Sequence, residues 1–219
     1  MEKKITDKIE KILPKYSWIP LILVVTVNLV TYFGTRLFTQ NLEHHVLQSR
    51  LDEMIPFCPV FIVIYILAYV QWIIGFIMIG RQDKNFCYKF LYGEIIAKLI
   101  CMLCYIFYPT TIIRPEITGS GIFNELTLWI YQADAPDNLF PSIHCLESWV
   151  VFRASLGMKN MPKWNPYVMF IFTILVFAST VFVKQHVVVD MFGAMAAFET
   201  GLFITKCFYK KRNSGLVYE

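Results

Sequence analysis

Six long apolar runs along the 219 residues constrain the fold of this chain more than any other feature. A helix needs about 20 predominantly apolar residues to cross the hydrocarbon core of a bilayer, and the runs reach or approach that length. By residue number they are 18–38, 60–79, 90–113, 141–156, 167–183 and 187–208. The sequence therefore predicts an all-α, polytopic integral membrane bundle of six transmembrane helices, with one membrane domain over 18–208.

The composition agrees with a membrane protein. Hydrophobic residues make up 57% of the chain and charged residues 16%, with a mean hydropathy of +0.53, whereas a soluble domain carries about a quarter charged residues. The net charge of +4 is small and lies in short clusters between apolar runs, which argues against a nucleic-acid partner. The bilayer is the expected partner, and no feature indicates an obligate protein partner.

The distribution of basic residues predicts the topology. With six spans, one side of the membrane carries 15 of the 20 Lys and Arg residues, and these include the basic segments 1–17 and 209–219. The other side carries four, and one lies inside a span. Because basic loops stay in the cytoplasm, we expect a multi-pass cell-membrane protein with both termini cytoplasmic. The loops 39–59, 114–140 and 184–187 then face the extracytoplasmic side. The first run is too long for a signal peptide and has no cleavage site.

One outer loop has a helical pattern of its own. Within 122–133, the apolar residues recur at helical spacing and the polar residues lie opposite them, which favours a short amphipathic helix in the interface. This helix could serve as a cap over the bundle or as a lid beside a lipid entry path. The residues Asp134, Asp137 and Asn138, which follow it, are predicted to form turns and helix caps.

A nucleophile and an acid are predicted at the outer ends of two runs. His186 and Asp190 are four residues apart and share a helix face. A carboxylate that holds one imidazole nitrogen fixes the tautomer and leaves the other nitrogen free to attack. His144, on a different run, could donate a proton to a leaving oxygen. We therefore assign His186, Asp190 and His144 to catalysis.

The same end of the bundle offers groups that recognise an anion. Arg114 provides a planar fork for phosphate and Lys184 a point charge. Ser142 adds a hydroxyl at the expected N-terminus of the fourth helix, where free N–H groups attract anions. The two histidines and Asp190 could instead form a metal site, but the two cations would repel a divalent ion. We expect phosphate chemistry with no metal and no cofactor.

These residues resemble a known family. The segments that carry the resemblance are Arg114-Pro115, Pro141-Ser142-Ile143-His144, and Ser179 followed by His186 and Asp190. They are similar to the three signature motifs of the type 2 phosphatidic acid phosphatase (lipid phosphate phosphatase) superfamily, over roughly residues 55–208. The resemblance implies a six-helix fold in which His186 forms a phosphohistidine, Asp190 orients it, and His144 protonates the leaving alcohol.

The motifs also depart from that family's pattern. Phe107 stands where the first motif usually has Lys, and Thr180 stands where the third usually has Arg. Lys184 is expected to supply the missing cation. Reduced first motifs also occur in the sphingomyelin-synthase-like and inositolphosphoceramide-synthase-like phosphotransferases, which share the His-Asp pair but pass the phosphoryl head group to a lipid alcohol.

The predicted function is hydrolysis of a lipid phosphomonoester or diphosphate at the extracytoplasmic face. Phosphatidic acid, phosphatidylglycerophosphate and undecaprenyl diphosphate represent the expected substrate class. The alternative is a lipid head-group phosphotransferase of the sphingomyelin or inositolphosphoceramide synthase type. A non-catalytic channel or scaffold is a third possibility, although its polar residues should form stripes along the spans rather than gather at one end.

Charged residues inside the runs are expected to pair. Glu94 and Lys98 are four residues apart and are predicted to form an ion pair on one helix. Arg153 and Glu199 could pair between helices. Glu147 lies one turn from His144, so both structural packing and a part in catalysis are open for it.

Overall fold

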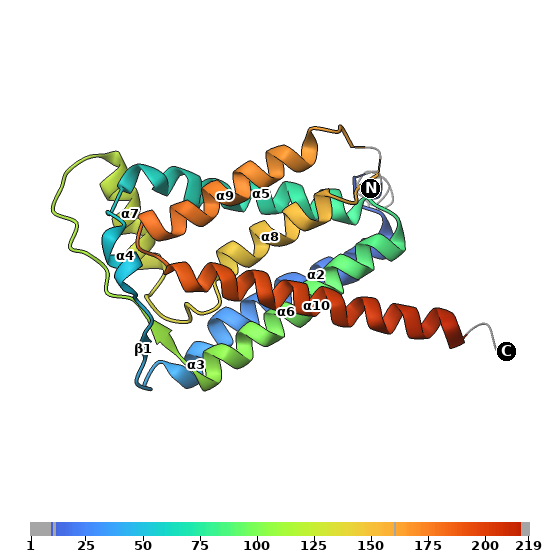
Figure 1. The fold of residues 1–219 in the computed structure, drawn as a ribbon, viewed down its shortest axis with the longest axis horizontal. Helices are drawn as coiled ribbons and strands as arrows, with labels where there is room; N and C mark the ends of the chain where they lie inside the picture. Colours follow the sequence, from blue (N-terminus) through green and yellow to red (C-terminus); the bar gives the residue numbers. More distant parts are fainter. Residues whose placement is uncertain (1–9, 11, 160, 216–219) are drawn as a thin grey trace, which may run out of the picture.

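The computed structural model describes residues 10, 12–159 and 161–215, so the predicted basic segments 1–17 and 209–219 lie partly outside the described residues. The described part is almost entirely helical (Figure 1). Five of its helical stretches are long and apolar enough to cross a membrane, and they are compatible with a membrane protein. They span Lys15–Thr39, Pro59–Gly80, Lys84–Phe107, Asn165–Phe182 and Val188–Lys210.

The elements follow the chain in a simple order. The first long helix joins α2 (Lys15–Leu29), a π-helical turn (Val30–Gly34) and α3 (Thr35–Thr39). Next come β1 (His45–Val46), α4 (Arg50–Met54), a 3-10 turn (Pro59–Phe61), α5 (Ile62–Gly80), α6 (Lys84–Phe107), β2 (Thr110–Thr111), α7 (Ile122–Ala133), α8 (Ile143–Ser155), α9 (Asn165–Phe182) and α10 (Val188–Gly215). The short strands β1 and β2 pair in parallel, with His45 opposite Thr110.

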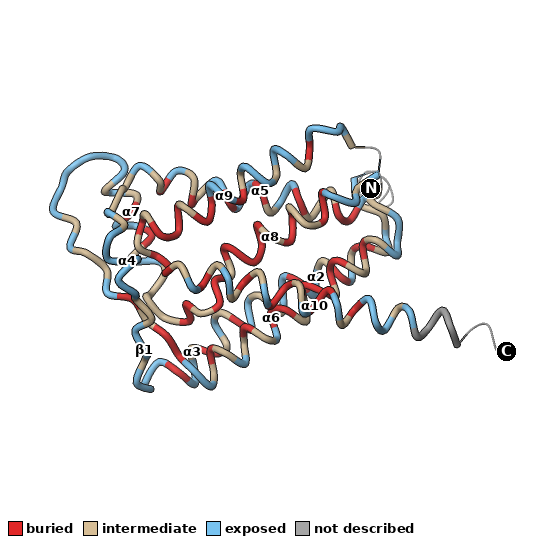
Figure 2. Tube along the Cα trace, viewed as in Figure 1, coloured by how far each residue is buried: buried red, intermediate tan, exposed pale blue. Residues whose placement is uncertain are grey.

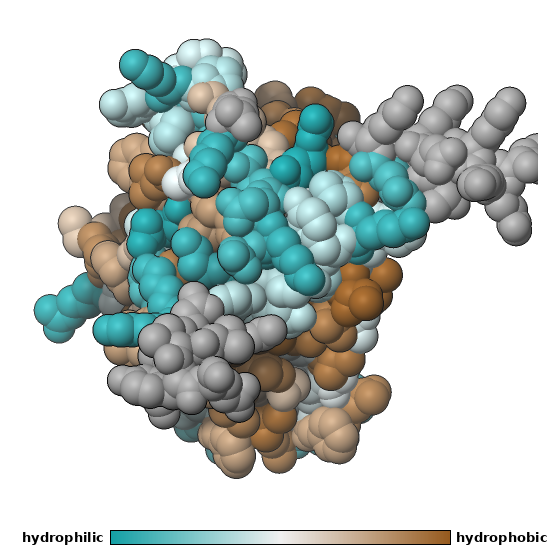
Figure 3. Space-filling model, turned by 90° about the vertical axis from the view of Figure 1, so that its right-hand side faces the viewer, coloured by the Kyte–Doolittle hydropathy of each residue, from teal (hydrophilic) through white to brown (hydrophobic). Residues whose placement is uncertain are grey.

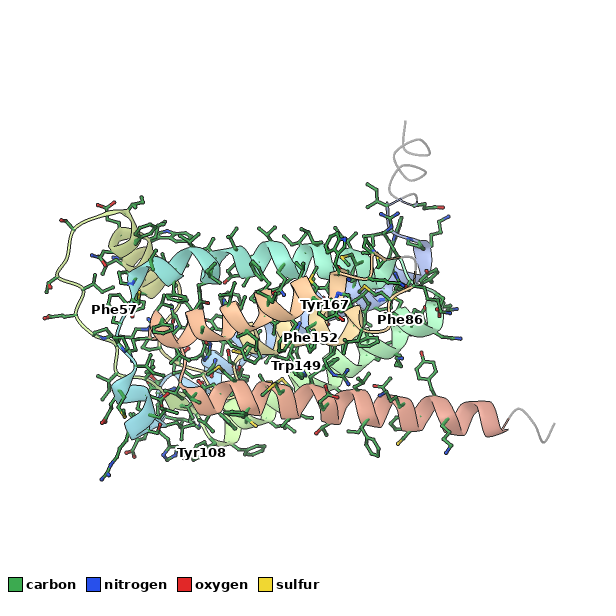
Figure 4. All side chains as sticks on the ribbon, turned by 45° about the horizontal axis from the view of Figure 1, so that its top comes forward. Phe57, Phe86, Tyr108, Trp149, Phe152 and Tyr167 are labelled. Atoms are coloured by element: carbon green, nitrogen blue, oxygen red, sulfur yellow. The ribbon has the colours of Figure 1, made fainter. Side chains whose placement is uncertain are left out.

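The predicted fourth span is a shorter, central helix. At 13 residues, α8 is about 20 Å long at 1.5 Å per residue, whereas the hydrocarbon core of a bilayer is about 30 Å thick. It packs against α5, α9 and α10, and most of its residues are buried (Figure 2). Trp149 and Phe152 lie close together on it, with ring centroids 5.2 Å apart (Figure 4). This helix is therefore enclosed by the longer ones.

The predicted boundaries of the third span, 90–113, were wrong, because the helix begins and ends six residues earlier in the chain. The helix α6 begins at Lys84, one residue after Asp83, whose carboxylate accepts a hydrogen bond from the Phe86 N–H at 3.0 Å. It ends at Phe107 rather than at residue 113. The cause is Pro109, because a proline lacks an N–H and disfavours helical backbone at the residue before it. The apolar residues that follow belong to β2 and a loop.

A buried charge cluster links three helices. The Lys98 Nζ on α6 lies 2.7 Å from Glu94 Oε1, 2.6 Å from Glu147 Oε1 on α8, and 3.3 Å from the Val24 carbonyl oxygen on α2. The Glu94–Lys98 pair is therefore present, and Glu147 joins it. We refer to Glu94, Lys98 and Glu147 as the lysine cluster.

A second charged pair also forms as expected. Arg153 on α8 donates to Glu199 on α10, with 3.1 Å between Nη2 and Oε2. Close to it, α6 and α10 approach tightly, since a Cβ atom at Gly201 would lie 2.2 Å from the Gly93 carbonyl oxygen. An ion pair therefore links α8 to α10, and the close approach of α6 and α10 requires the absence of a side chain at Gly201.

The two ends of the bundle differ from its sides. Figure 3 shows the end of the bundle from which the C-terminal part of α10 extends, and hydrophilic residues gather there with hydrophobic residues around them. The exposed basic residues of that end include Arg81, Lys84, Lys159 and Lys163. The opposite end, on the left of Figure 1, carries α4, α7 and β1, and the predicted catalytic residues lie toward it.

Candidate active site

Two histidines from separate elements meet near the α7 end of the bundle. His144 lies in the first turn of α8, and His186 lies in the short segment between α9 and α10. Their ring centroids are 6.2 Å apart, and both side chains are almost fully buried. The structure thus brings together the two histidines that the sequence proposed as nucleophile and acid.

His186 is held by the acid predicted to orient it. Its Nδ1 lies 3.0 Å from Asp190 Oδ2, and the same oxygen accepts the Val187 N–H at 3.1 Å. Asp190 is fully buried. When Nδ1 carries the proton donated to this carboxylate, Nε2 keeps its lone pair. The geometry therefore suits a nucleophilic Nε2.

His144 is surrounded by aromatic rings of α5. Tyr65 stacks on it at 4.2 Å between centroids, while Trp72 and Tyr69 meet it edge-on at 4.9 and 5.5 Å. The Tyr65 hydroxyl also lies 3.5 Å from His144 Nδ1. The other ring nitrogen, Nε2, has no hydrogen-bond partner among the described residues. These rings fix the orientation of the imidazole and leave one nitrogen available.

A cavity of about 430 Å³ connects the two histidines. Its walls come from α2, α5, α7 and the segment before α8, and aromatic side chains dominate them. At its edge, Leu29, Phe33 and Trp129 are each at least half exposed on the outside of the bundle. The cavity thus has an apolar rim and the two imidazoles on its wall.

Arg114 lies in the loop between β2 and α7, beside the segment that carries His186. Its guanidinium donates to the carbonyl oxygens of Tyr131 (3.2 Å) and Asp134 (2.8 Å), and to the side-chain oxygen of Gln185. Its Nε has no partner among the described residues. Burial lowers the pKa of Arg114, and the nearby Asp134 and Tyr131 offset part of that shift. Gln185 therefore connects Arg114 to the residue next to His186.

Lys184 and Ser142 do not line this cavity. The Lys184 Nζ donates to the carbonyl oxygens of Asp52 (2.8 Å) and Ile55 (2.5 Å). Burial lowers its pKa, and Asp52 acts in the opposite direction. The Ser142 hydroxyl is fully buried and accepts the Cys145 N–H at 3.3 Å as the N-cap of α8. Ser142 nevertheless lies beside the partner of His186, because its backbone N–H donates to the Asp190 carbonyl oxygen at 3.3 Å.

The structure adds one residue that supports the His186 segment. Asp52 on α4 is buried, and its Oδ1 accepts the N–H of Val188, the first residue of α10, at 2.7 Å. Its Oδ2 accepts from the backbone N–H and hydroxyl of Ser49 in a capping box. A Ser-x-x-Asp spacing indicates only the local box. The contact with Val188 depends on tertiary structure, so spacing could not reveal it.

A second added residue is Asp134, at the end of α7. It lines the cavity, and its carboxylate accepts hydrogen bonds from the hydroxyls of Tyr32, in the π-helical turn after α2, and of Tyr65 on α5, the latter at 3.4 Å. The sequence pattern predicted a turn residue here. Its place in the cavity results from the packing of three helices that are distant in the chain.

Among the described residues, no group of three or more His, Cys, Asp or Glu side chains could hold a metal ion. No family model matches the chain, and no curated protein or solved structure matches it. The resemblance to the lipid phosphate phosphatases therefore depends on the motif residues themselves.

Proposed function

We propose that the chain is a multi-pass protein of the cell membrane in which α8 is a short sixth membrane-embedded helix. The five long apolar helices around it support this arrangement. The helix α7 is proposed to lie in the outer interface, because Ile122 and Trp129 are exposed on one of its faces while Thr127 is buried. The charge distribution supports cytoplasmic termini and a cavity on the extracytoplasmic side.

Thiol labelling tests this topology. Single cysteines placed in the loop 115–121 should react with a membrane-impermeant reagent on intact cells. Cysteines placed at 82–84, in the loop at the opposite end of the bundle, should react only after lysis and serve as the matched control. The reverse pattern would place the cavity in the cytoplasm.

We propose that the protein is a lipid phosphate phosphatase of the type 2 phosphatidic acid phosphatase kind. The observation that carries the proposal is the pair of imidazoles on one cavity, with His186 held by Asp190. In this mechanism His186 Nε2 attacks phosphorus and the bond to the lipid oxygen breaks, while His144 gives that oxygen a proton. Water, deprotonated by His144, then attacks the phosphohistidine and releases phosphate.

The proposed substrate is a lipid because of the cavity and its rim. An aromatic cavity whose apolar rim faces the outside of the bundle suits a substrate arriving from the bilayer. The proposed class is a lipid phosphomonoester or diphosphate, represented by phosphatidic acid, phosphatidylglycerophosphate and undecaprenyl diphosphate. Arg114 is the proposed phosphate ligand, because its guanidinium donates to the side chain of Gln185, the residue next to His186. We propose no metal or cofactor for the reaction.

A lipid head-group phosphotransferase is the second candidate, and one observation favours it. Arg114 donates through both Nη atoms, and Lys184 through Nζ, to protein oxygens, and neither residue lines the cavity. A phosphomonoester carries up to two negative charges, whereas a phosphodiester carries one and needs less compensation. In the transferase, a lipid alcohol takes the place of water in the second step.

Phosphate release from the purified chain in detergent, with EDTA present, tests the phosphatase. We expect release from at least one of the three representative lipids, and none from the His186→Ala variant. His45→Ala, an exposed histidine on β1, is the matched control and should retain turnover. Transfer of a head group to added ceramide or diacylglycerol, without phosphate release, would instead identify the transferase. Full turnover by His186→Ala would refute both.

A further inference from the structure

One wall of the cavity is rich in hydrogen-bond acceptors that lack donors. Asn28, Asp137 and Asn138 line it, and the Oδ1 atom of each is buried and has no hydrogen-bond partner among the described residues. Asn138 is 3% exposed, and its Nδ2 donates to the Tyr32 carbonyl oxygen (3.2 Å) and the Thr35 hydroxyl (3.0 Å). Its Oδ1 is therefore the buried acceptor that remains.

Asp134 adds a carboxylate to this wall. Its carboxylate accepts from two tyrosine hydroxyls but forms no salt bridge with a Lys, Arg or His of the described part of the chain. Arg114 donates to its carbonyl oxygen instead. Asp137 pairs with Arg36 through Oδ2 at 3.0 Å, so only its Oδ1 is unpartnered. None of the described residues that line the cavity is Lys or Arg. The wall formed by Asn28, Asp134, Asp137 and Asn138 is called the acceptor wall below.

The chemistry of these groups determines what the wall can bind. Carboxylate oxygens and amide carbonyl oxygens only accept hydrogen bonds, and a buried acceptor without a donor is unfavourable. A phosphate group brings further acceptors and negative charge, so it does not complement the wall. A ligand with hydroxyl or N–H groups complements it, and the aromatic rings that share the cavity can pack against the ligand's apolar part.

The position of His144 indicates which part of the substrate lies beside the acceptor wall. His144 lines the same cavity, and in the proposed reaction its proton goes to the oxygen of the lipid alcohol. The group beside that oxygen therefore occupies the cavity, while phosphorus lies toward His186.

We propose that the acceptor wall binds the alcohol part of the lipid and selects lipids whose alcohol carries hydrogen-bond donors next to the phosphate ester. This inference rests on the proposed function and gives it a substrate class. Lipids with a free hydroxyl or an amide N–H beside the phosphate are favoured over those with acyl esters at every neighbouring position.

Three phosphomonoesters with matched acyl chains test the selection in mixed micelles with the full chain. Ceramide 1-phosphate offers a hydroxyl and an amide N–H, lysophosphatidic acid offers one hydroxyl, and phosphatidic acid offers neither. We expect kcat/KM for the two donor-bearing lipids to exceed that for phosphatidic acid by about tenfold or more, since a site with unpaired buried polar groups rejects a ligand that lacks their partner.

Two variants connect the selection to the wall. Asp134→Asn and Asn28→Ala remove acceptors from different helices, so each should lower the ratio of kcat/KM between ceramide 1-phosphate and phosphatidic acid. Glu125→Gln is the matched control, because Glu125 is an acidic residue of α7 that does not line the cavity, and it should keep the wild-type ratio. A ratio unchanged in both wall variants would overturn the inference.

The remaining outcomes separate the inference from the proposed function. Equal kcat/KM for all three lipids in the wild type would overturn the inference and leave the phosphatase intact. Absence of any turnover would refute the phosphatase, and binding of uncharged lipids would then decide the inference. Monoolein, which has two hydroxyls, should raise Tm more than methyl oleate, and Asp134→Asn should reduce that difference. Equal shifts for the two lipids would overturn the inference.

Discussion

The lysine cluster and the histidine cavity are both buried and polar, but they are built differently. The Lys98 ammonium group is 1% exposed and has three acceptors from three helices. At the cavity, His144 Nε2 and one side-chain oxygen each of Asn28, Asp137 and Asn138 have no hydrogen-bond partner among the described residues.

Glu94 Oε2 and Glu147 Oε2 also lack hydrogen-bond partners among the described residues, so what separates the two regions is charge. The carboxylates of the cluster face a buried ammonium group, whereas none of the described residues that line the cavity is Lys or Arg. Removing one member of a buried ion pair is strongly destabilising, whereas polar groups that converge on an aromatic cavity are typical of a site that binds a ligand. Substitutions in the lysine cluster should therefore lower mainly the stability of the protein, and substitutions at the histidine cavity mainly its activity.

The largest expected effect is the loss of turnover in His186→Ala. Without the nucleophile, kcat should fall by about 10⁴-fold or more. The free energy of unfolding should fall by only about 1–3 kcal/mol, because the variant loses the hydrogen bond to Asp190 while the Val187 N–H still donates to that carboxylate. Phosphate release and thermal unfolding of the purified variant in detergent measure the two effects. A large loss of stability together with residual turnover would show that His186 is a packing residue, and the comparison would fail.

The next largest effect concerns stability and comes from Lys98→Met. Removing the ammonium group leaves Glu94 and Glu147 buried without their cation, which typically costs about 3–5 kcal/mol. Turnover per folded molecule should stay close to the wild type. Lys84→Met, at the exposed start of the same helix, is the matched control and should change neither property.

A double variant sharpens the test of the lysine cluster. Lys98→Met with Glu147→Gln removes one of the two stranded carboxylates, and it should recover part of the lost stability. If Lys98→Met instead folds normally and loses turnover, the cluster belongs to the active site.

The sequence predicts local features of the fold and site well, and the reason is visible in particular residues. Glu94 and Lys98 are an i,i+4 pair within α6, so helix geometry alone places them together. His186 and Asp190 are also four residues apart, but His186 lies just before α10, and Asp190 Oδ2 reaches both its Nδ1 and the Val187 N–H. Glu147 joins Lys98 only because α8 packs against α6, and Asp134 reaches the cavity only because three helices meet there. Pro109 ended α6 earlier than hydropathy indicated, since backbone restriction outweighed the apolar residues that follow.

Asp52 should show a pH-dependent effect of intermediate size. Burial alone would raise the pKa of its carboxyl, but hydrogen bonds from Ser49 and the Val188 N–H, together with Lys184, lower it below the ordinary value. A lowered pKa in the folded state means that the stabilisation is complete above the unfolded pKa of about 3.9 and is lost as pH falls through the folded value.

Asp52→Asn should therefore be less stable than the wild type at pH 7 by about 1–3 kcal/mol, the usual effect of losing hydrogen bonds to a charged acceptor. Thermal unfolding between pH 7 and pH 3 should show this difference shrinking at the acid end. Glu53→Gln, the exposed neighbour on α4, is the control and should follow the wild type. A constant difference across this range would mean that the charge of Asp52 does not matter.

The smallest expected effect belongs to Lys184, and it distinguishes two roles. As a phosphate ligand, Lys184→Met should lower kcat/KM by about 10–10³-fold. If Lys184 has a structural role instead, Lys184→Met removes two hydrogen bonds to the carbonyl oxygens of Asp52 and Ile55. That loss should lower the free energy of unfolding by about 1–3 kcal/mol and leave kcat/KM within about threefold. The observed contacts favour the second outcome. Adding Thr180→Arg should not restore activity, because Thr180 is fully buried and its hydroxyl donates to the Phe177 carbonyl oxygen, so an arginine side chain would not fit there without repacking the site. A large drop in kcat/KM for Lys184→Met at unchanged stability would instead show that its ammonium group turns toward the phosphate when a substrate is bound.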